Sequence, residues 1–399
     1  MLVTFDPVRE VAKLREHLAS GDKLISFLFG AGTSSAVSAI DGKPLFPLVS
    51  GLTRGCQEKV ALMGAEFAEA WRAITEGLPA DKRTIEDILS FVRQMQSAVL
   101  DDDKLAGLSK AQISQLETTI RQTISQLVRP APDRYPETLP HHALARWIQR
   151  IDRVHAVEIF TTNYDTLFER ALEDCKLPTF DGFAGTYEPF FYPASLRFQS
   201  ASPGSDWTRI WKVHGSVTWT SKKNANGGFS IVRGPESASG EMILPSVLKY
   251  DESRKQPYVA MLDRLRDVLD KREDGVLVTS GYSFADQHIN EILFEALAHN
   301  PRLHLFALCF DDLPDSNQLI RTAKTASNVL VLGPKRAIVG GREGSWKVTD
   351  ADEAALRVPG LFELEAAEPD AEIDLSSGTL RLGDFNVFCD LLDQVAGKP

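Results

Sequence analysis

Cysteine is scarce in this chain of 399 residues, and its spacing excludes two common kinds of site. The cysteines are far apart along the chain, at Cys56, Cys175, Cys309 and Cys389. Structural zinc sites and redox pairs usually place two cysteines only a few residues apart. We therefore expect neither a disulfide scaffold nor a bound metal.

Long hydrophobic runs and an excess of basic charge are also missing. No apolar run approaches the ~20 residues that a membrane-spanning helix needs, and the first residues lack the features of a signal peptide. We therefore expect a cytoplasmic protein without membrane contact. The formal net charge of -11 repels a polyanion on average. Direct nucleic-acid binding is not expected, because it requires a basic face.

The composition is that of a globular protein. Hydrophobic residues make up 43% and charged residues 25% of the chain, which excludes wholesale disorder, collagen and coiled coil. Folded units usually contain roughly 100–200 residues, so we expect one large core with additions.

Short apolar runs alternate with helical stretches along most of the chain, as in a parallel sheet with crossover helices. The candidate strands are Leu24–Phe29, Ala156–Phe160, Arg209–Val213, Val276–Ser280, Leu303–Phe310 and Val329–Leu332. Buried strands of this kind predict an α/β fold with an open parallel sheet of about six strands.

The interval between the first two strands is longer than a crossover requires and is mostly helical. Ile85, Ile88, Leu89 and Val92 have the spacing of one helix face, and Thr84 is the expected N-cap of that helix.

A capping box at Ser109 and Gln112 predicts a further helix in the same interval. We interpret residues 50–140 as a helical subdomain inserted into a domain that spans residues 1–340. Residues 341–399 are acidic, and we interpret them as a C-terminal extension that contacts another subunit or a partner.

This extension is expected to end in a short apolar helix at Asn386–Val395. Phe385, Phe388, Leu391 and Leu392 suit a helix that lies on a neighbouring subunit. Packing on the core of the same chain is an equally open alternative.

A glycine-rich turn follows the first strand directly. Its residues are Gly30, Ala31, Gly32, Thr33 and Ser34. Two glycines let the backbone approach a ligand, and free N–H groups at the start of the next helix would face a phosphate. The dinucleotide fingerprint is incomplete, because Ser35 stands at the third glycine position. A turn that needs glycine only for packing is the alternative.

Polar residues follow three further strands. They are Thr161, Thr162, Asn163 and Asp165 after the second strand, His214 after the third, and Gly281 and Ser283 after the fourth. In open α/β sheets ligands bind at the carboxyl ends of the strands, and histidine titrates near neutral pH. The alternatives are that Thr162, Asn163 and Asp165 only cap a helix and that His214 is structural. His141 and His142 are left out, because they are expected to begin a surface helix.

Taken in order, these segments resemble the sirtuins. The matching segments are Gly30–Ser34, Thr161–Asp165, Lys212–Gly215 and Gly281–Ser283, within a resemblance that spans about Leu24 to Leu332. The resemblance implies a Rossmann-like domain that holds NAD+ and carries a smaller inserted module. It also implies that Asn163 and His214 serve the cleavage of the nicotinamide–ribose bond.

The same resemblance implies binding roles for other residues. Ala31, Gly32 and Thr33 would line the phosphates of NAD+, Asp165 would line the nicotinamide pocket, and Ser283 would lie on the adenosine side.

Two features depart from the protein deacylases of that family. Those enzymes carry two cysteine pairs in a zinc module before a strand that resembles Ile243–Val247, whereas Ser216–Met242 contains no cysteine. Lys249–Glu252 stands where the deacylases have a Phe-Gly-Glu loop that pairs with the substrate peptide. We therefore expect no zinc module and no docking of an acyl peptide.

What remains is similar to the bacterial sirtuin-like NADases of anti-phage defence, which deplete NAD+. The implied reaction is hydrolysis of NAD+ to nicotinamide and ADP-ribose. His214 would act as general base, Asn163 would orient the ribose and the water, and Asp165 would favour the positive charge that develops on the ribose. A zinc-free deacylase or ADP-ribosyltransferase and a non-catalytic sensor of NAD+ or ADP-ribose are the alternatives.

The resemblance extends to partners. The tail segment Leu382–Cys389 resembles the tail of those sirtuin-like defence proteins that are found with a hexameric HerA-type ATPase. Other proteins of this type are found with a short Argonaute. The resemblance also implies a homo-oligomer. We expect the HerA-type ATPase as the partner.

Overall fold

A computed structural model gives the structure of this chain. It describes residues 3–80, 83–101, 103–197, 201–224, 227–236, 256–271, 273–350, 359–364 and 377–397.

The centre of the protein is a parallel sheet. Its six central strands are β2 (Leu24–Phe29), β5 (Glu158–Thr161), β9 (Thr208–Lys212), β12 (Gly275–Ser280), β13 (Leu303–Leu308) and β14 (Val329–Leu332). They lie in the order β14-β13-β12-β2-β5-β9, and every neighbouring pair is parallel. Counted along the chain this is the order 6-5-4-1-2-3 of a Rossmann fold. The predicted α/β class and all six predicted strands are confirmed.

Further strands extend this sheet beyond the six that the apolar runs predict. The additional strands are β1 (Val3–Phe5), β6 (Thr179–Phe180), β15 (Arg336–Val339) and β16 (Arg342–Trp346). The described part of the sheet therefore has ten strands. The edge strand β1 pairs with β16, so a segment near the start of the chain lies beside Arg342–Trp346 at one edge of the sheet.

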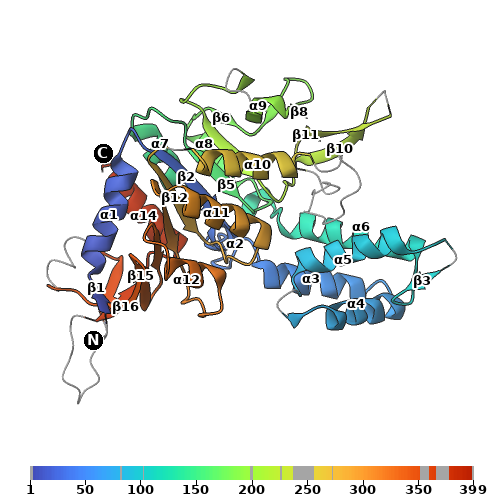
Figure 1. Cartoon of the computed structure of the whole chain (residues 1–399). Coiled ribbons are helices and arrows are strands. Elements are labelled where there is room, and N and C mark those ends of the chain that lie inside the picture. Colours follow the sequence, from blue (N-terminus) through green and yellow to red (C-terminus); the bar gives the residue numbers. More distant parts are fainter. Residues whose placement is uncertain are drawn as a thin grey trace, which may run out of the picture.

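Helices cover both faces of the sheet (Figure 1). One layer contains α1 (Pro7–Ala19), α7 (His141–Arg150), α8 (Leu167–Asp174) and α14 (Phe385–Val395); the other contains α9 (Ala194–Arg197), α10 (Tyr258–Leu269), α11 (Gln287–His299) and α12 (Gln318–Ala323). Successive side chains of a strand point to opposite faces, so Phe27 of β2 packs in the first layer and Leu28 in the second. Burial on both faces explains why β2 is apolar throughout.

A separate helical group lies beside the sheet (Figure 1). It consists of α3 (Val49–Ala61), α4 (Ala65–Gly77), α5 (Ile85–Ala98), α6 (Lys110–Leu127) and the short pair β3 (Lys104–Leu105) and β4 (Leu108–Ser109). Thr84 caps α5, and Ser109 and Gln112 form the expected capping box of α6. The group has its own hydrophobic core, into which Tyr164 and Val217 from the sheet domain also pack.

A second, small sheet lies near β9. It contains β7 (Phe183–Ala184), β8 (Phe190–Phe191), β10 (Trp219–Lys223) and β11 (Phe229–Arg233), and β10 and β11 form an antiparallel hairpin.

The C-terminal residues are part of the same fold. The strand β16 belongs to the main sheet, and β17 (Phe362–Leu364) pairs with β18 (Gly378–Leu380) ahead of α14. Phe385, Phe388, Leu391 and Leu392 are buried in the first helix layer. Of the two alternatives for this helix, the structure shows packing on the core of its own chain.

No helix of the described residues combines the length and the apolar character that crossing a membrane requires.

Replacement of Phe388 tests how α14 contributes to the fold. The side chain is fully buried against Phe27 and Phe385, so Phe388→Ala should lower the free energy of unfolding by about 3–5 kcal/mol. Denaturant unfolding of the purified protein measures the loss. Asp390→Ala, on the exposed side of the same helix, should change the stability by less than about 0.5 kcal/mol. Equal effects of the two substitutions would contradict this packing.

Candidate active site

The strand order creates a switch point between β2 and β12. The chain leaves β2 toward β5 on one side and β12 toward β13 on the other. Open α/β sheets bind ligands in the crevice at the carboxyl ends of such a strand pair. The turn that follows β2 and the turn that follows β12 are therefore the first places to look for a site.

These two turns are in close backbone contact. The amide of Gly32 donates to the carbonyl oxygen of Gly281 at 3.0 Å. A Cβ atom on Gly32 would lie 2.6 Å from the Cα atom of Gly281. Gly281 itself has a φ of +63°, and a Cβ atom there would lie 2.5 Å from the amide nitrogen of Thr33. Glycine is required at both positions, because any side chain would force the turns apart.

The amides of this turn are engaged within the chain. Gly30 donates to the carbonyl oxygen of Ser280 at 3.1 Å, Gly32 donates to that of Gly281 at 3.0 Å, and Thr33 donates to that of Gly30 at 3.0 Å. The expectation that free N–H groups at the start of the helix face a phosphate is therefore wrong for these three amides. The following helix, α2 (Ala31–Ser35), is a single short turn. The packing interpretation of the glycines is the one that the geometry supports.

Asn163 joins the end of β5 to the glycine-rich turn. Its Nδ2 atom donates to the carbonyl oxygen of Gly30 at 3.0 Å, to Oγ1 of Thr33 at 3.0 Å and to Oγ of Ser34 at 2.7 Å. These acceptors fix which end of the amide is the nitrogen. Among the described residues, Oδ1 of Asn163 has no hydrogen-bond partner, so this oxygen can accept a bond from a ligand. The side chain is only 6% exposed.

Asp165 combines a capping contact with a contact to the same turn. Its Oδ1 atom accepts a hydrogen bond from the amide of Leu167 at 3.0 Å, at the start of α8. Its Oδ2 atom accepts one from Oγ of Ser34 at 2.6 Å. One oxygen of Asp165 therefore does cap a helix, as the alternative in the sequence analysis holds. Asn163 caps no described helix, because its side chain bonds from the end of β5 to the turn after β2.

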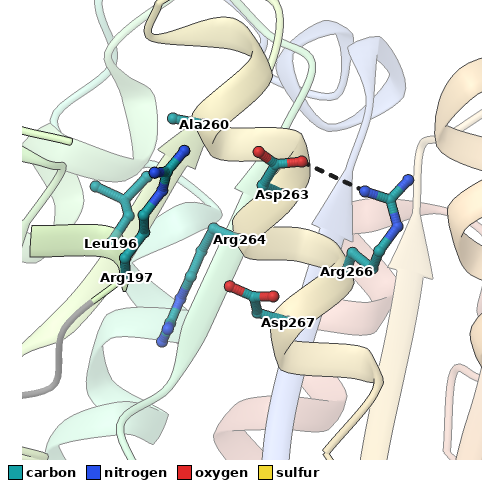
Figure 2. Close-up of a pocket in the computed structure, with 7 residues that line it drawn as sticks. All are labelled: Leu196, Arg197, Ala260, Asp263, Arg264, Arg266 and Asp267. Atoms are coloured by element: carbon teal, nitrogen blue, oxygen red, sulfur yellow. Dashed lines mark hydrogen bonds and ion pairs between the residues drawn. The ribbon is translucent and has the colours of Figure 1, made fainter. Parts of the chain in front are cut away.

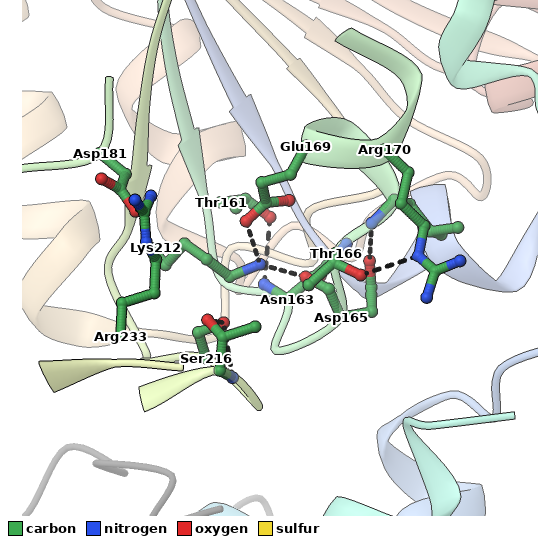
Figure 3. Close-up of polar contacts among 12 residues, drawn as sticks. Thr161, Asn163, Asp165, Thr166, Glu169, Arg170, Asp181, Lys212, Ser216 and Arg233 are labelled. Atoms are coloured by element: carbon green, nitrogen blue, oxygen red, sulfur yellow. Dashed lines mark hydrogen bonds and ion pairs between the residues drawn. The ribbon is translucent and has the colours of Figure 1, made fainter. Parts of the chain in front are cut away.

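A buried lysine supports the loop that carries these two residues. Lys212, the last residue of β9, donates to the carbonyl oxygen of Asp165 and lies 3.2 Å from Oε1 of Glu169 (Figure 3). Burial raises the pKa of Glu169, and the charge of Lys212 opposes that rise. The backbone contact at Asp165 holds the loop at the carboxyl end of β9.

His214 lies between two carboxylates. Its Nε2 atom is 2.9 Å from Oδ2 of Asp286, and its Nδ1 atom is 3.4 Å from Oε1 of Glu86. Burial alone would lower the pKa of His214, which is only 3% exposed, but the two carboxylates outweigh it and raise the pKa to about 10. The imidazole is therefore protonated at neutral pH in this arrangement.

Neither carboxylate is among the predicted site residues. Asp286 follows the predicted Gly281–Ser283 segment and caps α11 through the amide of Ile289, so its place near the site could have been inferred from that segment. Glu86 is in the first turn of α5 in the helical group. No feature of the sequence around Glu86 indicates a contact with His214.

The structure brings most of the predicted residues together. Gly30, Thr33, Ser34, Asn163 and Asp165 are joined by hydrogen bonds, and Gly32 and Gly281 by close packing. His214 contacts Asp286, and Asp286 is in the same turn as the predicted residue Ser283. Ala31 and Thr162 are half-buried and Ser283 is exposed. No hydrogen bond between described residues joins the side chain of Thr162 or Ser283 to the others.

Some predictions fall outside this site. Ile243–Val247 and Lys249–Glu252 lie outside the described residues. Within the described ranges, no group of three or more His, Cys, Asp or Glu residues is placed to hold a metal ion. His141 and His142 do begin α7, but both are buried, so the expectation that they lie on the surface is wrong.

A hollow of about 270 Å³ lies elsewhere, between α9 and α10 (Figure 2). Its lining residues are Leu196, Arg197, Ala260, Asp263, Arg264, Arg266 and Asp267. Arg264 pairs with Glu158, the first residue of β5. The hollow is therefore near the amino end of that strand, away from the carboxyl-end cluster.

Alanine substitution of Gly281 tests the close approach of the two turns. Gly340 provides the matched control, because it also has a positive φ, +58°, but no atom lies within 4 Å of a Cβ placed there. Gly340→Ala should cost about 1–2 kcal/mol for the backbone conformation alone. Gly281→Ala should cost about 1–3 kcal/mol more, because the added carbon overpacks the contact. Denaturant unfolding of both variants measures the difference, and equal losses would refute the proposed need for close approach.

Residues 157–330 match the family model described as SIR2-like domain. No curated protein matches the chain. A solved structure from work on the mechanism and regulation of Sir2 enzymes is 14% identical, with 82% of this chain and 92% of that chain covered and a TM-score of 0.32. A mutant Sir2 homologue in complex with ADP-ribose is 15% identical, with 76% and 86% covered and a TM-score of 0.32. The fold assignment rests on the strand order of this chain, and the family match over residues 157–330 supports a sirtuin-like family.

Proposed function

We propose that this protein is an NAD+ glycohydrolase, which cleaves the nicotinamide–ribose bond with water. The products are nicotinamide, ADP-ribose and a proton. The observation that carries the proposal is the set of hydrogen bonds from Asn163 to the Gly30–Ser34 turn at the switch point of a Rossmann sheet. The match to the SIR2-like domain supports NAD+ as the ligand.

Asn163 is proposed to orient the ribose. Its nitrogen is held by three acceptors, so its orientation is fixed before a ligand arrives. The remaining oxygen, Oδ1, is the atom that would accept a hydrogen bond from a ribose hydroxyl or from the attacking water. Such preorganisation lowers the barrier, because the group does not have to reorient during the reaction.

Asp165 is proposed to stabilise the charge that develops as nicotinamide leaves. The bond breaks with its electron pair going to the pyridinium ring, which leaves positive charge on the ribose. The carboxylate of Asp165 is 4% exposed and is held by Ser34 and Leu167. A fixed negative charge in a site with little water favours a cationic transition state.

The remaining predicted residues are proposed to bind the rest of the dinucleotide. The half-buried Ala31 and Gly32, with Thr33, would lie along the phosphates, and the exposed Ser283 would lie on the adenosine side. Thr162 would contribute to NAD+ binding beside Asn163.

His214 is proposed as the general base that removes a proton from a ribose hydroxyl or from water. A base must be unprotonated, whereas the contacts with Glu86 and Asp286 favour the protonated ring. Catalysis therefore requires at least one of these two contacts to loosen.

Water is proposed as the acceptor, because Ser216–Met242 has no cysteine for the zinc module that accompanies acyl-peptide binding in the deacylases. We further infer a role in bacterial anti-phage defence by NAD+ depletion, in a homo-oligomer that a HerA-type hexameric ATPase controls. The support for this role is that Leu382–Cys389 resembles the corresponding segment of the sirtuin-like proteins found with a HerA-type ATPase. Measuring NAD+ turnover with and without such an ATPase tests the inference, and unchanged turnover would count against this partner.

Turnover of NAD+ alone tests the proposed reaction. Asn163→Ala and His214→Ala should each reduce nicotinamide release by about 10²–10⁴-fold, because each removes one positioned group from the transition state. Chromatography of nicotinamide and ADP-ribose measures the rate, and circular dichroism checks the fold. Asn386→Ala and His299→Ala replace the same residue types on α14 and at the end of α11 and should leave the rate unchanged.

Three outcomes would contradict this proposal. Full turnover in either site variant removes that residue from the mechanism. Nicotinamide release that appears only when an acyl-lysine peptide or a protein acceptor is added would replace hydrolysis by group transfer. Saturable binding of ADP-ribose without turnover would make the protein a sensor.

A further inference from the structure

His214 receives its two carboxylates from different parts of the fold. Asp286 belongs to the sheet domain, at the start of α11 (Gln287–His299). Glu86 belongs to the inserted helical group, in the first turn of α5 (Ile85–Ala98). The two side chains contact opposite nitrogens of the imidazole, at 2.9 Å for Asp286 and 3.4 Å for Glu86.

We propose that Glu86 is a positioning residue through which the inserted helical group holds His214 in its protonated form and so restrains the NAD+ chemistry of the site. The proposal rests on the proposed function for its catalytic consequence. The contact itself is independent of that function.

Glu86 and Asp286 favour the protonated ring of His214, whereas burial opposes it. The groups that face it or its carboxylates are Glu86 from α5, Asp286 and His288 from α11, Tyr258 from α10, and Tyr164 and Tyr282 from the turns after β5 and β12. Among these groups, His288 helps to lower the pKa of Asp286. The net effect of the neighbours is to raise the pKa of His214 to about 10, against the lowering that burial causes.

Glu86 is itself held by the site. Its Oε1 atom accepts a hydrogen bond from the hydroxyl of Tyr164 at 3.2 Å. Tyr164 is directly next to Asn163 and packs in the hydrophobic core of the helical group together with Val217. A shift of α5 would therefore change the environment of His214 and of the Asn163 loop at the same time.

His214 and Glu86 differ in exposure, so the contact between them can be broken from the Glu86 side. The His214 side chain is 3% exposed, whereas that of Glu86 is 33% exposed. Solvent or a bound ligand can therefore reach Glu86 without first unpacking His214. Loss of the Glu86 contact would leave Asp286 on Nε2, which is the arrangement in which Nδ1 can lose its proton and act as a base.

Glu86→Gln is the test, because it removes the charge and keeps the shape of the side chain. The first readout is the pKa of His214, measured by NMR of protein labelled at histidine and assigned by the signal that His214→Gln removes. The second readout is the pH profile of NAD+ turnover. Asp87→Asn is the matched control: it removes one negative charge from the same helix turn, where Asp87 bonds to Thr84.

In Glu86→Gln we expect a lower pKa of His214, and a rise in turnover at neutral pH of about tenfold for each unit by which that pKa falls. Asp87→Asn should change neither. An unchanged pKa of His214 in Glu86→Gln would overturn the proposal whatever the enzyme does. If the wild-type protein turns over NAD+, a lower pKa with reduced or unchanged turnover in Glu86→Gln would also overturn it, because Glu86 would then assist the reaction or have no part in it.

Absence of turnover in every variant, with the pKa of His214 still lowered by Glu86→Gln, would refute the glycohydrolase function and leave the hold of Glu86 on the protonated ring supported. The two failures are therefore distinguishable. Circular dichroism of Glu86→Gln confirms that α5 remains folded, and Glu86→Ala should give the same direction of change in the pKa.

Discussion

The site depends on the close approach of two backbone turns at the switch point of the sheet. Gly32 and Gly281 are in contact without an intervening side chain, and a hydrogen bond joins them. This contact places the turn after β2 beside the turn after β12, although more than two hundred residues separate them in the chain. Two other contacts of the cluster start from these turns: Asn163 bonds to the first, and His214 bonds to Asp286, which caps the helix after the second.

Several polar groups buried around this contact bond to one another. Asn163 gives its amide protons to the glycine-rich turn, Ser34 donates to Asp165, and Lys212 donates to the backbone of Asp165. A buried polar group that lacks a partner costs about 1–3 kcal/mol, so losing any one member would leave a partner unsatisfied. Such a network holds the loop and the side chain of Asn163 in one conformation.

The sequence predicts the central strands well and the edge of the sheet poorly, for a physical reason. Strands such as β2 are buried on both faces and so appear as apolar runs. The strand β16 includes Arg342, Glu343 and Ser345 and lacks such a run, and its partner β1 lies at the other end of the chain. The sequence does not predict the burial of His141 for a similar reason, because the side chains that pack against it, Phe168 and Phe385, are on two other helices.

Local sequence also predicts only part of the site. The part that it does not predict comes from the inserted helical group. Asn163, Asp165 and His214 follow strands, so their place could be inferred from local sequence, whereas the position of Glu86 depends on how α5 packs. The raised pKa of His214 adds stability below its ordinary value of 6.5 that is lost as the pH rises through about 10. The lowered pKa values of Glu86 and Asp286 add stability that is lost only in acid. At neutral pH all three groups are charged and stabilise the contact between the helical group and the sheet. The arrangement that favours the folded state is thus the one in which His214 is protonated, so the proposed role of His214 as a base requires work against a stabilising interaction.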